Sequence, residues 1–143
     1  MKLTNYEIKN IADALMKPDS LLYSSEKLPI KILWVIDGNL QKLNDIKKRI
    51  NDKQEEINQE YNNDEKSELT TFENGELGRK VKPEFLKEYQ DQINELMLIK
   101  NDVDIETLSI DVFENILLSP SEFGSIRFML EDSKKEEEEW NYQ

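Results

Sequence analysis

The chain has 143 residues, of which 37% are hydrophobic and 35% are charged, and its formal net charge at pH 7 is −12. This length predicts a single domain with enough apolar residues for a core but few to spare. Cysteine and histidine are both absent, which excludes disulfides, zinc sites with thiolate or imidazole ligands, and Ser–His or Cys–His catalytic pairs. We therefore expect a protein that is not an enzyme and that uses no cofactor and no bound metal.

The acidic excess, 31 acidic residues against 19 basic ones, decides which partners the surface attracts. A negative surface repels phosphate backbones, so we expect no direct binding to nucleic acid. Five of the basic residues form one cluster, Lys42, Lys47, Lys48, Arg49 and Lys53. We interpret this cluster as a solvated helix face. Neither an apolar run of membrane-spanning length nor a leader pattern is found, so we expect no membrane association and a cytoplasmic location.

The first predicted element is a helix over about residues 5–16. Thr4 and Glu7 form a capping box, in which the Thr4 hydroxyl accepts a hydrogen bond from the Glu7 N–H and the Glu7 carboxylate accepts one from the Thr4 N–H. Leu3 and Ile8 are placed to close a hydrophobic staple across this cap. A loop rich in Pro and Ser follows the helix.

A much longer helix is predicted over about residues 30–61. Trp34 is expected to pack in the core, because large aromatic side chains within apolar runs are usually buried. Gly38 costs about 1 kcal/mol relative to Ala inside a helix, so it indicates a kink or the close crossing of another segment. The helix also carries a heptad seam, with apolar residues at alternating spacings of three and four and two polar a positions, formed by Leu33, Ile36, Leu40, Leu43, Lys47, Ile50, Gln54, Ile57 and Tyr61.

The length of this helix is the main argument for a partner. At about 1.5 Å per residue it is roughly 48 Å long, more than the other, shorter helices of such a domain are expected to cover. Polar a positions lower the stability of a coiled coil but fix its register, which suits a specific pairing within the chain or between chains. The alternative is that the second half of the helix extends into solvent. The predicted partner-binding or oligomerisation residues are Leu43, Lys47, Ile50, Gln54, Ile57 and Tyr61.

Short strands are predicted on both sides of a third helix. Asn74-Gly75 is a type I′ turn signal, since both turn positions need a positive φ, and it predicts a β-hairpin over about residues 69–81. Pro83 then opens the third helix, which is expected to end near residue 100. Alternating apolar and polar residues over about 103–113 predict a strand segment.

A fourth helix and a charged tail complete the chain. Ser119 and Glu122 form a second capping box, with Pro at the first helical position. Residues 1–132 are thus predicted to form one α+β domain, predominantly α. Residues 133–143 are expected to be an acidic, flexible tail, with the alternative that Glu136–Glu139 and Trp140 form a docking peptide.

Several of these segments resemble a family encoded by bacteriophages, domain of unknown function 1617. The resemblance rests on capping and packing motifs rather than chemical ones: residues 3–8 and 10–15, Leu28-Pro29-Ile30, residues 103–105, Leu118-Ser119-Pro120 and residues 128–132. It implies a small cytoplasmic protein made by tailed phages or prophages in the cytoplasm of a low-GC Gram-positive host. The family supplies no catalytic residues to transfer. A bias toward Lys, Asn and Ile, typical of AT-rich coding sequence, is consistent with this origin.

The leading hypothesis is a phage accessory protein that binds another protein and so inhibits or redirects a host or defence factor. This hypothesis rests on the acidic surface, on the absence of Cys and His as catalytic residues, and on the long helix. The alternative is a virion structural or assembly-chaperone protein that self-associates through the long helix. A carboxylate-metal enzyme is a third, less favoured hypothesis.

Overall fold

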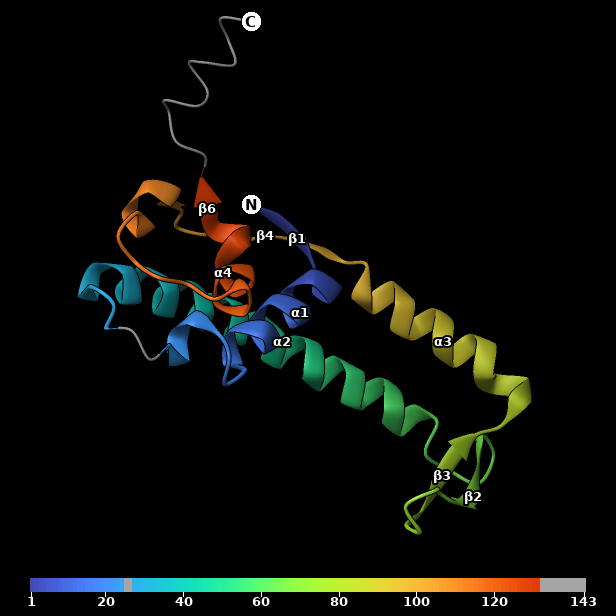
Figure 1. The fold of residues 1–143 in the computed structure, drawn as a ribbon. Coiled ribbons are helices and arrows are strands. Elements are labelled where there is room, and N and C mark those ends of the chain that lie inside the picture. Colours follow the sequence, from blue (N-terminus) through green and yellow to red (C-terminus); the bar gives the residue numbers. More distant parts are fainter. Residues whose placement is uncertain (25–26, 132–143) are drawn as a thin grey trace, which may run out of the picture.

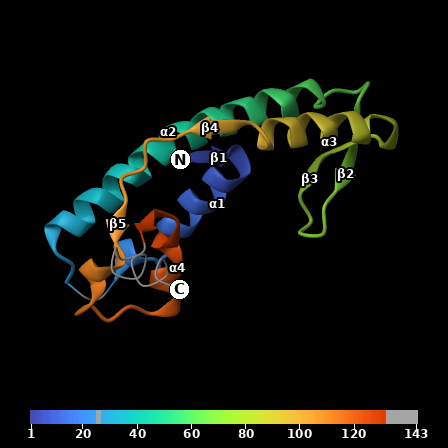
Figure 2. The same cartoon turned by 90° about the horizontal axis from the view of Figure 1, so that it is seen from above.

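Helix α2 (Ile30–Glu60) forms the axis of the molecule in the computed structural model, which describes residues 1–24 and 27–131. Helix α1 (Asn5–Met16) packs along its first part, and α3 (Pro83–Met97) runs back beside its second part. We call residues 51–97 the arm and the other described residues the body. Figures 1 and 2 show the arm projecting from the body, with a hairpin at its far end.

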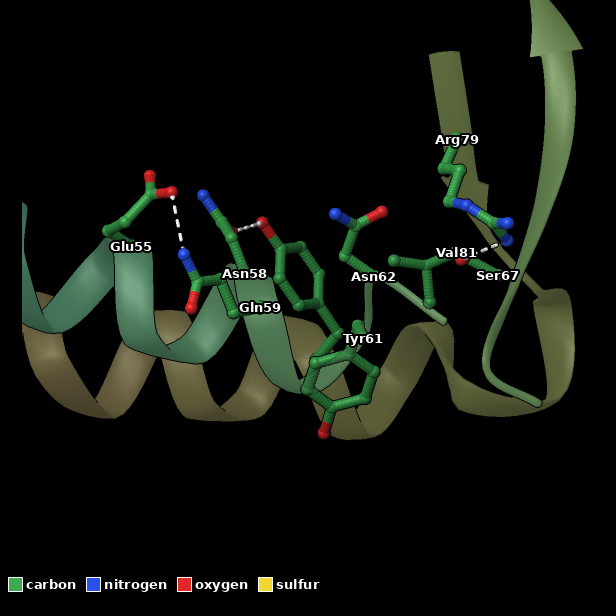
Figure 3. Close-up of a pocket in the computed structure, with 9 residues that line it drawn as sticks. Glu55, Asn58, Gln59, Tyr61, Asn62, Ser67, Arg79 and Val81 are labelled. Carbon is green, nitrogen blue, oxygen red and sulfur yellow. Dashed lines mark hydrogen bonds between the residues drawn. The ribbon is translucent and has the colours of Figure 1, made fainter. Parts of the chain in front are cut away.

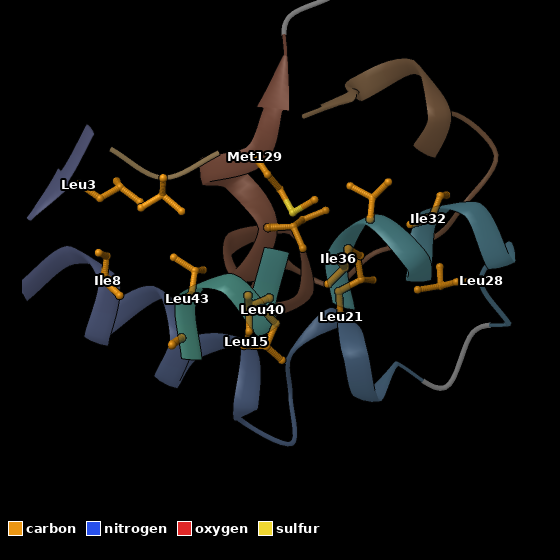
Figure 4. Close-up of a cluster of buried hydrophobic side chains, with 14 of the residues drawn as sticks. Leu3, Ile8, Leu15, Leu21, Leu28, Ile32, Ile36, Leu40, Leu43 and Met129 are labelled. Atoms are coloured by element: carbon orange, nitrogen blue, oxygen red, sulfur yellow. The ribbon is translucent and has the colours of Figure 1, made fainter. Parts of the chain in front are cut away.

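The body is built on a continuous apolar core (Figure 4). Apolar side chains of α1 and of the first half of α2 meet there, and the 3₁₀ turns Leu21–Tyr23 and Arg127–Met129 close its sides. Burial of these side chains is the main favourable term in folding. Buried side chains of this core include Leu3, Ile8, Leu15, Leu21, Ile36, Leu40, Leu43 and Met129.

Both predicted capping boxes are confirmed. The Glu7 N–H donates to the Thr4 Oγ1 over 3.1 Å, and the Thr4 N–H donates to the Glu7 Oε1 over 3.1 Å. Leu3 and Ile8 are buried, as the staple requires. The second box, at Ser119 and Glu122, opens α4 (Pro120–Ile126). Side-chain oxygens thus satisfy backbone donors that lack a partner in the first turn of a helix.

Two short strand pairs join distant parts of the chain in the body. Strand β1 (Lys2–Thr4) pairs antiparallel with β4 (Lys100–Asp102), placing Leu3 opposite Asn101. Strand β5 (Leu108–Ser109) pairs in parallel with β6 (Leu130–Glu131). These pairs fix both ends of the described chain to the body.

The predicted strand segment at 103–113 is largely wrong. Only Leu108–Ser109 is a strand, and Ile110–Phe113 is a 3₁₀ turn. The backbone of residues 104–106 forms hydrogen bonds with side chains of α2 instead of with a strand. Asn39 accepts from the Glu106 N–H over 2.9 Å and donates to the Glu106 carbonyl over 2.8 Å, and the Lys42 ammonium donates to the Asp104 carbonyl.

The hairpin of the arm is confirmed, but its turn type is not. Strands β2 (Ser67–Thr71) and β3 (Leu77–Val81) pair antiparallel. Among the described residues only Gly75 has a positive φ, +84°, so Asn74 does not adopt the type I′ conformation. The Gly75 N–H donates to the Phe72 carbonyl and the Phe72 N–H to the Glu76 carbonyl, which is a three-residue loop with a glycine bulge.

Two expectations about α2 are also corrected. Trp34 is 78% exposed rather than packed in the core. Gly38 does not interrupt α2, and no described segment crosses it closely, because a Cβ at this position would meet nothing within 4 Å. The reason for a glycine here is therefore not found among the contacts of the described residues.

The predominantly α, α+β fold class is confirmed, with four α-helices in residues 1–24 and 27–131. None of the described helices is both long enough and apolar enough to cross a membrane. The predicted tail at 133–143, with Glu136–Glu139 and Trp140, lies outside the described residues.

Candidate functional site

The heptad seam is paired within the chain. Leu43 and Ile50 are buried in the body core, and Tyr61 is buried at the far end of the arm. Ile57, between them, is half-buried. Two short helices, α1 and then α3, cover in succession the length that was expected to need a partner.

The polar seam residues point to the same internal pairing. The Lys47 ammonium forms an ion pair with the Asp13 carboxylate of α1. The Lys9 ammonium of α1 donates to the Gln54 Oε1 over 3.1 Å. Both polar a positions therefore set the register of α1 on α2, the role that polar residues have in coiled coils. Of the two pairings that the seam allows, within the chain or between chains, these contacts are of the first kind.

Three of the five cations in the basic cluster on α2 have partners within the chain. Lys42 donates to the Asp104 carbonyl, Lys47 pairs with Asp13, and Lys53 pairs with Glu56 over 3.0 Å. Lys48 and Arg49 are exposed and form no ion pair within the described part of the chain. Arg49 and Lys53 line one hollow of about 360 Å³, but the acidic residues Asp52 and Glu56 line it too, which disfavours a phosphate there.

A polar hollow of about 270 Å³ lies between the end of α2 and the hairpin (Figure 3). Its polar groups are largely occupied by one another. The Arg79 guanidinium pairs with Asp64 over 2.7 Å and lies 3.5 Å from the Ser67 hydroxyl, while the Tyr89 hydroxyl donates to the Asn58 amide oxygen. Mutual pairing of this kind joins β3 to the loop after α2, and α3 to α2, and leaves little to recognise a ligand.

Tyr61 is the anchor beneath this hollow, only 1% exposed. Its ring meets Tyr89 edge-to-face, with centroids 5.2 Å apart, and the Lys66 ammonium lies 5.0 Å from its centroid. The Gln92 side chain donates to its hydroxyl over 2.9 Å. Burial, together with the charge and hydrogen bond of the Glu88 carboxylate, raises the pKa of Tyr61 above its usual value, so the phenol stays protonated.

A different surface, on the body, is open and apolar. A hollow of about 580 Å³ lies between the first turns of α2 and the segment that carries β5 and the following 3₁₀ turn. Ile30 is 74% and Trp34 78% exposed, and Val112 is exposed opposite them. We call this the Trp34 surface and define it by its lining residues, Ile30, Lys31, Ile32, Trp34, Val35, Glu106, Leu108 and Val112.

Buried contacts hold the far wall of the Trp34 surface in place. Asn39 is 1% exposed and pairs with both backbone groups of Glu106, which fixes the path of residues 104–108 over α2. The β5–β6 pairing then positions Leu108 opposite Leu130. Both walls are therefore formed before any ligand arrives, which lowers the entropy lost on binding.

The Glu122 carboxylate caps the first turn of α4. Hydrogen bonds from the Ser24 side chain and from the Ser119 backbone and side chain lower the pKa of Glu122 below its usual value. These bonds tie the start of α4 to the loop after the 3₁₀ turn at Leu21–Tyr23. Their role is to stabilise the charged cap of α4 rather than to prepare a reactive group.

Within residues 1–24 and 27–131, no three acidic side chains lie close enough together to hold a metal ion.

The Trp34 surface was not predicted, because Trp34 was inferred to be buried from its apolar neighbours alone. A signal was present: Ile30 and Trp34 are four residues apart and lie off the seam, so they share a different helical face. Leu108 and Val112 gave no such signal, because a strand rather than a turn was predicted there.

Comparison with protein-family models, curated proteins and solved structures finds no match to this chain.

Proposed function

We propose that this protein acts by binding another protein and that the Trp34 surface is the contact. The observation that carries the proposal is a tryptophan 78% exposed beside other exposed apolar side chains on a rigid wall. Exposed apolar patches of this kind are characteristic of binding sites, and Trp is enriched among residues that dominate binding energy. Burying its exposed area contributes roughly 2–4 kcal/mol to an interface.

A non-enzymatic accessory protein of a phage or prophage, working in the bacterial cytoplasm, is the biological setting we propose. It rests on the resemblance of the capping and packing motifs and on the absence of Cys and His from the sequence. Inhibiting or redirecting a host or defence factor requires only a binding surface. An assembly role in the virion is the second candidate, with the same surface meeting a structural protein in place of a host factor.

Affinity capture from bacterial cells that make the protein tests this proposal. We expect one partner to be retained by the wild type and lost by Trp34→Asp. Leu77→Asp is the matched control, because Leu77 is 84% exposed on the hairpin at the other end of the molecule. Circular dichroism should show both variants folded, since neither side chain is buried.

The identity of the partner decides between the two settings. A host enzyme or defence subunit supports the accessory role, and a capsid or tail protein supports the assembly role. Equal retention of every partner by wild type, Trp34→Asp and Leu77→Asp would contradict the proposal. Loss of the partner in Leu77→Asp alone would move the site to the hairpin.

A further inference from the structure

The charges around the Trp34 surface are mostly negative. Glu106 lines it, Asp37 follows Trp34 by about one helical turn, and Asp111 precedes Val112 in the 3₁₀ turn. All three carboxylates are exposed, and the ion pairs of the described residues include none of them. Asp37 accepts a hydrogen bond from the Gln41 amide over 3.0 Å, and as exposed charges all three can pair with a cationic partner.

Positive charge on this surface is smaller. Lys31 lies among the lining residues, and the first turn of α2 has no side-chain cap and no acidic residue. The exposed end of a helix acts as roughly half a positive charge. Lys27 lies beyond Ile30, where it lines a neighbouring hollow. Three carboxylates thus face two lysines and a helix end, and the net charge of −12 makes the long-range field negative.

Gly38 supplies an independent observation. It lies four residues after Trp34 in α2, so the two positions share a face of the helix. A Cβ here would meet nothing within 4 Å, so packing among the described residues does not require a glycine that lowers helix stability. A glycine does allow the backbone of another segment to approach a helix closely.

We propose that the segment which binds the Trp34 surface is an amphipathic helix with Lys or Arg flanking its apolar face, and that it crosses α2 over Gly38. The inference deepens the proposed function and rests on it. Apolar residues of the helix would cover Trp34 and Val112, and its cations would meet Asp37, Glu106 and Asp111. Helices that lay an apolar face into a hydrophobic groove are a recurrent mode of recognition.

Charge also argues against two other occupants. A second copy bound through the same surface by two-fold symmetry would bring the acidic rim against itself, and like charges oppose such an interface. The terminal sequence of the chain carries four consecutive acids, Glu136–Glu139, which the same rim would repel. A basic helix would meet neither of these repulsions.

Three synthetic 14-residue peptides test the inference directly. The first places Leu and Lys in a helical amphipathic pattern, the second replaces each Lys by Glu, and the third is a scrambled Leu/Lys sequence with the same charge but no apolar face. The protein is the full chain with Trp140→Phe, so that Trp34 is the only tryptophan and its fluorescence reports occupancy. Two-dimensional NMR of the same samples locates the contact.

We expect saturable binding of the amphipathic Leu/Lys peptide alone, with a blue shift of Trp34 emission and shifts confined to the Trp34 surface and Gly38. Asp37→Lys should weaken this binding on the order of threefold, and added salt should weaken it through screening over about 8 Å at 0.15 M. Gly38→Ala should weaken it by about tenfold while raising Tm. Gly124→Ala in α4 is the control, because a Cβ there also meets nothing within 4 Å.

Each other outcome overturns the inference. Binding of the Leu/Glu peptide at the Trp34 surface would leave the proposed function standing but reverse the charge of the partner. Equal binding of the scrambled peptide, or no binding at all, would contradict the proposal that the bound segment is an amphipathic helix. A Gly38→Ala variant that binds the peptide as tightly as the wild type does would contradict the proposed crossing of α2 at Gly38. Dimerisation of the free protein that Trp34→Asp abolishes would assign the surface to a second copy. NMR resonances of the Trp34 surface that differ between the wild type and Trp140→Ala would assign it to the chain terminus.

Discussion

The body and the arm use the same long helix in opposite ways. In the body α2 meets α1, three 3₁₀ turns and α4 around one apolar core, whereas in the arm only Tyr61 and Ser67 are buried among residues 51–97. Helix α3 itself contains no buried residue. The arm therefore has few buried side chains, at its tip, and is held at its base by Leu96 and Met97 against the body core, while the body spreads its stability over many side chains. Local opening free energies follow such differences in buried contacts.

Leu43→Ala should have the largest effect, because Leu43 is fully buried where α2 crosses the body core. We expect the free energy of unfolding to fall by about 2–5 kcal/mol, through lost burial and the cavity that remains. Urea denaturation followed by far-UV circular dichroism measures it. Ile57→Ala, on the same seam but half-buried in the arm, is the matched comparison, and an equal loss there would contradict the division into body and arm.

Tyr61→Ala should open the arm and leave the body intact. The lost ring contacts with Tyr89 and Lys66 should lower the local opening free energy by up to about 3 kcal/mol. Amide hydrogen exchange should show this in residues 51–97 and little change in α1. Tyr61→Phe, which keeps the ring but loses the hydroxyl, should cost only about 1 kcal/mol.

The Tyr61 hydroxyl also makes the arm sensitive to alkali. Its pKa in the folded protein is raised above that of the unfolded chain, so its contribution to stability is complete below about pH 10 and is lost as the pH rises through the folded value. Exchange in the arm should therefore quicken at high pH beyond the intrinsic rate. Tyr61→Phe removes the group and should remove this additional loss.

Asn39→Ala tests how the wall of the Trp34 surface is held. Its amide pairs with both backbone groups of Glu106, so the substitution leaves a donor and an acceptor without their partners. We expect a loss of about 1–3 kcal/mol and faster exchange at Glu106. Asn51→Ala, at an exposed position of the same helix, should change stability little. Matching losses in the two variants would mean that the Asn39 amide does not fix this wall.

Gly38→Ala should act in the opposite direction. A Cβ at this position meets nothing within 4 Å, so the alanine should stabilise α2 by up to about 1 kcal/mol. A modest rise in Tm by calorimetry is the expected result. A fall in Tm would show a constraint on α2 that the described contacts do not contain.

The smallest effect is expected from Glu122. Hydrogen bonds from Ser24 and Ser119 hold its pKa in the folded protein below that of the unfolded chain. Its contribution is therefore present above the unfolded pKa and lost as the pH falls through the folded value. Denaturation midpoints of wild type and Glu122→Gln should converge on acidification. Midpoints that stay equally far apart at every acidic pH would contradict this role.

Local chemistry made the helices and their caps predictable from the sequence. Thr4, Glu7, Ser119 and Glu122 act within one turn of their own helix, so no knowledge of distant contacts was needed. The hairpin followed from Asn74-Gly75 for the same reason, although a bulge replaced the expected turn. These features depend on spacing alone.

Tertiary contacts were not accessible in this way. The heptad pattern of α2 was correct. Such a pattern predicts that one face of the helix is packed but does not identify the element packed on it. Here α1 packs on the first part of α2 and α3 on the second. Residues 103–107 alternate as a strand does, yet Asn39 and Lys42 bind their backbone. Trp34 was misplaced because an apolar neighbourhood in sequence does not determine which helical face meets the core.

Photo-crosslinking compares the two candidate contact surfaces most directly. A benzophenone amino acid replaces Trp34 in one full-length protein and Ile57 in another, and each is irradiated in the bacterial cells that make it. The account predicts a covalent adduct with a partner protein from position 34 and none from position 57, because the seam is covered by this chain's own helices. An intermolecular adduct from position 57, with none from position 34, would contradict it.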